Sequence, residues 1–197
     1  MKVTRLISHV ASVFLALNAG AALAADWDGF YAGGSYESNT GDYHDYSIPN
    51  TFVGTSYGLS GSSASAFSGY LFDAGNYVFG GEVSTMLSGN TSSTAGSAPR
   101  NLDFVGPVTD IKMRAGAEFG NALLYGVAGA SFANFSGYGV NVPVSGLAYG
   151  IGVDFQITPV YFVGIEYLSR SMTGVLQGPD DVDVNLDSLA FRVGMLF

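Results

Sequence analysis

After residue 24 the sequence contains eight segments in which side chains alternate with a period of two, and no run of 18 or more apolar residues. Such alternation is typical of β-strands, whereas a membrane-spanning helix needs about 20 apolar residues. Yet 48% of the residues are hydrophobic, 28 are glycine and only 12% are charged. Because a sheet can enter lipid only when closure pairs every backbone amide, these features predict a membrane β-barrel.

The predicted strands are joined by links of two alternating lengths. The second, fourth and sixth links are short, at residues 73–76, 120–121 and 157–160, and the other links are longer. Alternate links of an antiparallel sheet lie at opposite ends, so we predict an all-β, eight-stranded antiparallel transmembrane β-barrel with short periplasmic turns and long extracellular loops. The predicted strands are residues 29–37, 63–72, 77–86, 106–119, 122–133, 146–156, 161–170 and 187–197.

Charged residues fall on one face of their predicted strands, opposite an apolar face. In the fourth strand Asp110, Lys112 and Arg114 alternate with Ile111 and Met113. A lysine or arginine facing lipid at mid-depth costs about 2–4 kcal/mol, so these charges are expected to face the lumen. Eight strands leave an interior that side chains can fill, which predicts a plug rather than a channel. The predicted lumen charge network is Glu82, Asp110, Lys112, Arg114, Asp154, Glu166 and Arg192.

Two predicted strands, 63–72 and 122–133, have apolar or small residues on both faces, so their facing stays open. Aromatic residues near strand ends are expected to form the girdles that flank the apolar band of such barrels. The predicted girdle residues are Tyr31, Tyr77, Tyr125, Tyr149, Phe155, Tyr161 and Phe197.

The first 24 residues have the pattern of a secretory signal peptide. Lys2 and Arg5 precede a mostly apolar run, and Ala22-Leu23-Ala24 supplies the small residues of a cleavage site before Ala25. Cleavage between Ala24 and Ala25 leaves residues 25–197 as one barrel domain. Removal of two basic residues makes a chain of net charge −9 still more acidic, which argues against nucleic acid as a partner. The chain has no cysteine, so no disulfide supports the exported fold.

Several stretches resemble the small outer-membrane β-barrel proteins of Gram-negative bacteria, of the porin-family and OmpA-like type. Trp27 and DGFYAGGSY (28–36) resemble the family's W-x-G-F-Y-x-G opening. YGIGVDFQITPVYFVGIEYL (149–168) is similar to its G-x-G-x-E-Y hairpin, with Asp154 in place of the usual glutamate, and DIKMRAGAEFGNALLYGVAGASFA (110–133) resembles its central hairpin. FRVGMLF resembles the closing strand. The resemblance implies an outer-membrane location and a C-terminal insertion signal for the barrel-assembly machinery, made of Phe191, Val193, Met195 and Phe197.

His44 is the only histidine after residue 24, and it lies in the predicted first loop beside Asp42, Tyr43 and Asp45. A hydrolase or acyltransferase would need a serine, a histidine and an acid to converge. No second histidine stands near a strand end, so we interpret His44 as a solvated loop residue.

The run Asp181-Val-Asp183-Val-Asn185-Leu-Asp187 is similar to the start of a calcium loop. It fails the pattern because the sixth position is Leu186 rather than glycine and the twelfth is Arg192 rather than glutamate. Its own alternation instead predicts an acidic extended hairpin above the membrane. Val182, Val184 and Leu186 would share one side of that hairpin.

The sequence thus predicts a non-enzymatic integral outer-membrane protein with an envelope-stabilising or surface-interaction (adhesin-like) role, and no cofactor or metal. The expected partners are outer-membrane lipid and lipopolysaccharide, the barrel-assembly machinery, and a host or surface ligand at the loops. The alternatives are a small diffusion pore, a lipid A-modifying enzyme, and a soluble periplasmic ligand barrel of the lipocalin type. The last alternative requires polar outward faces.

Overall fold

The computed structural model describes residues 26–45, 55–93, 104–137, 140–175 and 181–197. The predicted signal peptide and its cleavage site at Ala24 and Ala25 lie outside these residues. Within the described part of the chain, no helix is long and apolar enough to cross a membrane.

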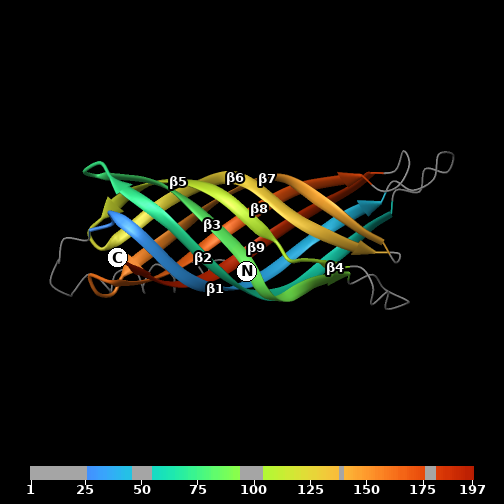
Figure 1. Ribbon diagram of the computed structural model, residues 1–197, viewed down its shortest axis with the longest axis horizontal. Helices are drawn as coiled ribbons and strands as arrows, with labels where there is room; N and C mark the ends of the chain where they lie inside the picture. Colours follow the sequence, from blue (N-terminus) through green and yellow to red (C-terminus); the bar gives the residue numbers. More distant parts are fainter. Residues whose placement is uncertain (1–25, 46–54, 94–103, 138–139, 176–180) are drawn as a thin grey trace, which may run out of the picture.

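The described strands form one closed antiparallel sheet, whose strands run obliquely to the long axis of the barrel (Figure 1). β4 and β5 both pair with β3 and β6, so they occupy one position and the barrel is eight-stranded, as predicted. The barrel closes where β1 pairs with β9. The strands are β1 (Gly29–Asp45), β2 (Thr55–Asp73), β3 (Tyr77–Ser93), β4 (Phe104–Val105), β5 (Thr109–Phe119), β6 (Ala122–Gly137), β7 (Val140–Gln156), β8 (Tyr161–Val175) and β9 (Asp181–Leu196).

The predicted fourth strand, 106–119, begins too early. Residues 106–108 leave the sheet because Pro107 has no N–H to donate to a ladder. Two single hydrogen bonds hold the break: the Gly106 N–H donates to the Asn134 carbonyl at 3.1 Å, and the Met86 N–H donates to the Val108 carbonyl at 2.8 Å.

The strands are also longer than the sequence indicated. We predicted irregular loops over 38–62, 88–102 and 134–145, but β1, β2, β3, β6 and β7 all continue into these segments. The expected alternation is hidden there because inward positions such as Asn39 and Gly41 are not apolar. By contrast, the predicted extension of the last strand through Val182, Val184 and Leu186 is confirmed, since all three side chains are fully buried in β9.

The outer surface of the barrel divides into an apolar band and a polar zone. The apolar band reaches from the short turns to the level of Tyr36 and Leu189, and beyond it the outward residues are mostly small and polar, with Pro143 and Val175 as exceptions. At about 3.3 Å per residue, the tilted wall from Tyr36 to Asp45 extends about 20 Å past the band. The outward residues of this strand extension include Ser38, Thr40, Ser60, Ser62, Ser88, Asn90, Ser92, Asn134, Asn141, Ser145, Ser171, Thr173 and Asn185.

The facing of the two ambiguous strands is now defined. In β2, Phe67 and Leu71 face the lumen and Tyr70 faces outward, while in β6 Leu123 faces the lumen and Leu124 faces outward. The apolar outward band is the reverse of what a water-soluble ligand barrel requires.

The girdle prediction is wrong for two residues. Tyr31 and Tyr125 lie inside the barrel with 1% and 3% exposure, because each sits on the same face of its strand as the inward residues around it. Phe155 is half-buried. Tyr77, Tyr161 and Phe197 are exposed beside the short turns, as predicted, whereas Tyr149 is exposed in the middle of β7, because that strand begins earlier than predicted.

Candidate functional site

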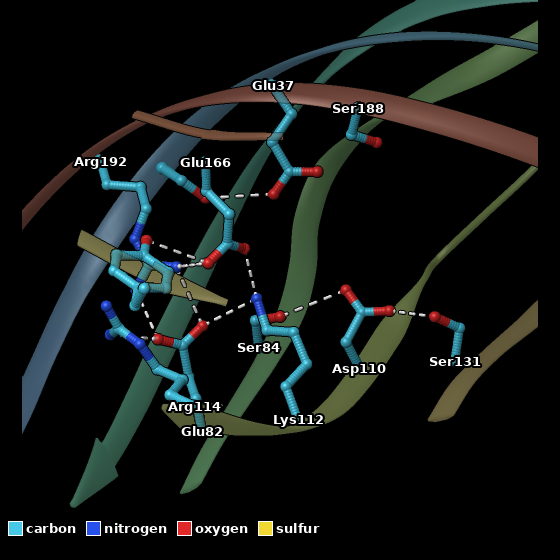
Figure 2. Close-up of polar contacts among 12 residues, drawn as sticks. Glu37, Glu82, Ser84, Asp110, Lys112, Arg114, Ser131, Glu166, Ser188 and Arg192 are labelled. Atoms are coloured by element: carbon cyan, nitrogen blue, oxygen red, sulfur yellow. Dashed lines mark hydrogen bonds and ion pairs between the residues drawn. The ribbon is translucent and has the colours of Figure 1, made fainter. Parts of the chain in front are cut away.

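Ionisable side chains from five strands converge in the lumen (Figure 2). β5 contributes two of them, because alternate residues of one strand face the same way. No side chain in this group is more than 4% exposed. We call these residues the inner cluster: Glu82 of β3, Lys112 and Arg114 of β5, Asp154 of β7, Glu166 of β8 and Arg192 of β9.

Glu82 is the centre of the inner cluster. Its carboxylate accepts from Lys112 Nζ at 2.9 Å and from Arg114 Nη1 at 3.1 Å, and it also pairs with Arg192. The other carboxylates complete the network: Lys112 Nζ lies 2.5 Å from Glu166 Oε1, and Arg114 Nη2 lies 2.5 Å from Asp154 Oδ2. Buried charges are costly unless they are paired, and every charge of the inner cluster has a partner, although Arg114 Nε and Arg192 Nε have no hydrogen bond within the described residues.

The two buried tyrosines belong to the same network. The Tyr31 hydroxyl donates to Glu82 Oε2 at 2.8 Å, and the Tyr125 hydroxyl donates to Glu166 Oε2 at 3.1 Å. The Arg114 guanidinium carbon lies 3.8 Å from the centre of the Tyr125 ring, a cation–π contact. Gly152 makes room for this ring, since a Cβ there would lie 2.4 Å from the Tyr125 ring.

Asp110 belongs to a second cluster, nearer the long-loop end. Its main cation is Arg170, which was not predicted from the sequence. Arg170 Nη2 lies 2.7 Å from Asp110 Oδ2, and its Nη1 donates to Ser188 Oγ at 2.5 Å. Glu37 lies 3.9 Å from the same guanidinium. Arg170 could have been found from the sequence, because it follows Glu166 by four residues on one strand and therefore shares its face.

Two groups of buried, mostly apolar side chains lie toward the two ends of the lumen, and the first also reaches alongside the charged clusters at Ala148 and Leu168. The short-turn layer is Trp27, Tyr31, Phe67, Leu71, Val78, Leu123, Tyr125, Val127, Ala148, Phe162, Leu168 and Leu196. The loop-end layer is Tyr43, Leu59, Met86, Val105, Val108, Ala133, Phe135, Val142, Val144, Met172, Val182, Val184 and Leu186. A cavity between the two charged clusters, beside Glu37, Lys112 and Arg170, has a volume of about 10 Å³. That is room for about one water molecule.

The remaining candidate residues lie outside the lumen. His44 belongs to β1 rather than to a loop, half-buried on its outward face, with Nε2 2.9 Å from Asp42 Oδ2. In β9, Asp183, Asn185 and Asp187 alternate with buried apolar residues and face outward. Among the described residues, no group of three or more histidine, cysteine, aspartate or glutamate side chains is arranged to hold a metal ion.

The residues of the predicted insertion signal line one face of the closing strand. Phe191 and Val193 of β9 and the terminal Phe197 are exposed on the apolar band, and Met195 is half-exposed beside them. The Phe197 N–H donates to the Phe30 carbonyl at 2.8 Å, so the end of the chain is fixed to the start of β1.

The chain path is partly similar to those of several solved structures. The crystal structure of Ail, the attachment invasion locus protein of Yersinia pestis, is 16% identical, with a TM-score of 0.47 over 86% of this chain and 99% of that chain. Neisserial surface protein A is 15% identical, with a TM-score of 0.47 over 84% and 99%. The outer membrane protease OmpT from Escherichia coli is 10% identical, with a TM-score of 0.40 over 89% and 99%.

No curated protein sequence matches this chain. Its sequence does match a family model described as "Outer membrane protein beta-barrel domain", over residues 10–197. That span includes every described strand of the closed barrel. The chain therefore belongs to the outer-membrane protein β-barrel domain family.

Proposed function

We propose that this protein is a non-enzymatic outer-membrane barrel that stabilises the envelope and makes surface contacts through its strand extension. The observation that carries the proposal is the combination of a filled lumen with a wall that continues past the apolar band. The wall there has a polar outer face and an apolar interior, the loop-end layer. Paired strands present their outward side chains at fixed spacings, which suits them to contacts with lipopolysaccharide or with a surface ligand.

The filled lumen favours this role over the diffusion pore. Ions would have to cross two apolar layers and a network in which Glu82 and Arg192, among others, are already paired. We therefore expect the purified barrel to give no sustained conductance in planar bilayers. Steady single-channel currents whose ion selectivity changes in Lys112→Gln would instead establish the pore.

His44 is the residue on which a lipid A-modifying activity of this barrel would depend, with Asp42 beside it and Ser56 opposite it on β2. Its imidazole is half-buried on the outer wall beside Asp42, away from the enclosed clusters. If the barrel is not an enzyme, as we propose, lipid A should have the same mass spectrum with and without the protein. A mass change that disappears in His44→Ala would show that the barrel is an enzyme.

The surface role is tested by charge changes on the strand extension. Ser60 and Asn90 are exposed on its outward face, on adjacent strands. We expect Ser60→Glu/Asn90→Glu to weaken surface binding or outer-membrane integrity in whole cells while the barrel still folds, because the added carboxylates repel the phosphates of lipopolysaccharide. The matched control is Ala74→Glu/Asn76→Glu, which places the same two charges on the exposed short turn at the opposite end. Equal effects of the two changes, or no effect of either, would contradict the proposal.

A further inference from the structure

The three residues before β1 cross the mouth of the barrel at the short-turn end. In the barrel order β1-β9-β8-β7, β7 lies three positions from β1. Nevertheless, the side-chain Nε2 of Gln156, the last residue of β7, donates to the Asp26 carbonyl at 2.8 Å. The Asp73 N–H at the end of β2 donates to Asp28 Oδ1 at 3.2 Å. Residues 26–28 therefore span the mouth from one side of the wall nearly to the other.

Trp27 occupies the centre of this crossing segment. Its side chain is fully buried, although it lies outside every strand, and its ring centroid is 6.0 Å from that of Phe162. Its indole N–H has no hydrogen-bond partner within the described residues. The ring is therefore held by apolar packing in the short-turn layer, where its bulk fills the opening of the barrel.

Gly29 allows the chain to turn from the mouth into the wall. Its φ of +117° lies in a region that L side chains rarely adopt, and a Cβ at this position would lie 2.7 Å from the Phe197 carbonyl oxygen. The segment thus bends at Gly29, beside the carbonyl group of Phe197.

We propose that residues 26–28 are a latch that seals the short-turn mouth, with Trp27 as its plug, and that release of the latch hydrates the lumen without unpairing any strand. The reason is a difference in attachment. The wall is held by continuous hydrogen-bond ladders, whereas the described contacts of the latch with the mouth are two hydrogen bonds and the packing of one ring. Segments with few contacts open at lower free energy than paired strands.

The chain has no cysteine, so a single introduced thiol can report on water entry. Leu123→Cys places a thiol in the short-turn layer with Trp27, and Val184→Cys places one in the loop-end layer at the far end. We expect a water-soluble thiol reagent to label Leu123→Cys about tenfold faster when Trp27 is replaced by alanine, because the seal is lost. Trp27→Phe should keep labelling slow, and Val184→Cys should stay slow in every background.

Equal acceleration at both cysteines would mean that Trp27→Ala loosens the whole barrel, and no acceleration at Leu123→Cys would mean that the ring seals nothing. Either result overturns the proposal.

A second variant leaves the plug intact. Gln156→Ala removes the donor to Asp26, and it should raise acrylamide quenching of Trp27, the only tryptophan, several-fold. Asn76→Ala on the same rim is the matched control and should leave quenching unchanged; equal quenching in the two variants would also refute the latch.

Discussion

The guanidinium of Arg170 on β8 binds both carboxylate oxygens of Asp110 on β5, with Nε 3.0 Å from Oδ1 and Nη2 2.7 Å from Oδ2. The two residues are 60 positions apart in the sequence and meet across the lumen. Two parallel N–H···O bonds fix the relative position of two strands that are not neighbours in the sheet. The pair is therefore a cross-brace inside the barrel.

Replacing one partner of this pair should destabilise the barrel. Arg170→Leu leaves Asp110 as a buried charge without its main cation, which costs about 3–5 kcal/mol. The free energy of unfolding in urea, measured in lipid bilayers, checks this value. The double variant Arg170→Leu/Asp110→Asn should recover much of the loss. Equal stability of Arg170→Leu and the parent protein would contradict the brace.

Glu82 should be a costly residue to neutralise. Glu82→Gln removes the charge shared by Lys112, Arg114 and Arg192, so we expect a loss of about 3–5 kcal/mol in the free energy of unfolding. Asp183→Asn, which neutralises a half-buried carboxylate on the outer wall, should change it by about 0.5 kcal/mol or less. Similar losses in the two variants would mean that a carboxylate of the inner cluster contributes no more to the free energy of unfolding than one on the outer wall.

The boundary of the apolar band can be located with arginine. Ile151 is 65% exposed on the lipid-facing band, so Ile151→Arg should cost about 2–4 kcal/mol in a bilayer. Ser60 is exposed on the strand extension, and Ser60→Arg should cost about 1 kcal/mol or less. Unfolding titrations of both variants in the same vesicles test the difference. A large cost at Ser60 would place lipid much higher on the wall.

The loop-end layer should hold the strand extension together. Phe135 is 1% exposed and its ring centroid lies 4.9 Å from that of Tyr43, so Phe135→Ala should cost about 3–5 kcal/mol. Limited proteolysis of the refolded variant should cut the extension while the membrane band stays intact. The control is Phe132→Ala on the lipid-facing side of the same strand. If both variants are cut alike, the extension does not depend on its apolar interior.

The terminal phenylalanine should matter for assembly more than for stability. Phe197 is 71% exposed, so Phe197→Ala removes little packing, and the refolded barrel should unfold at nearly the same urea concentration. Insertion in cells should fall several-fold, as measured by the heat-modifiable folded fraction in membranes. The control is Phe72→Ala, which removes a similarly exposed ring near the same end. Normal insertion of Phe197→Ala would contradict the prediction that Phe197 belongs to the insertion signal.

Sequence reasoning succeeded where charge alternates with apolar residues. Lys112 and Arg114 could face only one way because their neighbours Ile111 and Met113 are apolar, and the structure buries both charges. It failed for Tyr31 and Tyr125, because an aromatic ring suits both the girdle and the lumen. Their burial and their hydrogen bonds to Glu82 and Glu166 show that both rings lie in the lumen, on either side of Arg114.

The strand extension was missed for a different reason. Its outer face is hydroxyl-rich and parts of its inner face are polar, as at Asn39 and Ser63, which hydrogen-bond to each other at 3.0 Å. A period of two is invisible when both faces are polar. The pairing becomes evident only through cross-strand register, such as Thr40 opposite Ser60.

Because the basic side chains face inward, the charge on the outer wall differs from the charge inside the barrel. Each lysine and arginine of the described residues (Lys112, Arg114, Arg170 and Arg192) is enclosed, whereas several aspartates remain accessible on the outside. Among the described residues, folding therefore encloses the positive charges and leaves negative charges on the outer wall. On the part of the outer wall that the structure describes, a phosphate or sulfate group would therefore meet carboxylates and no basic side chain, so a divalent cation that bridges the two should favour its adhesion.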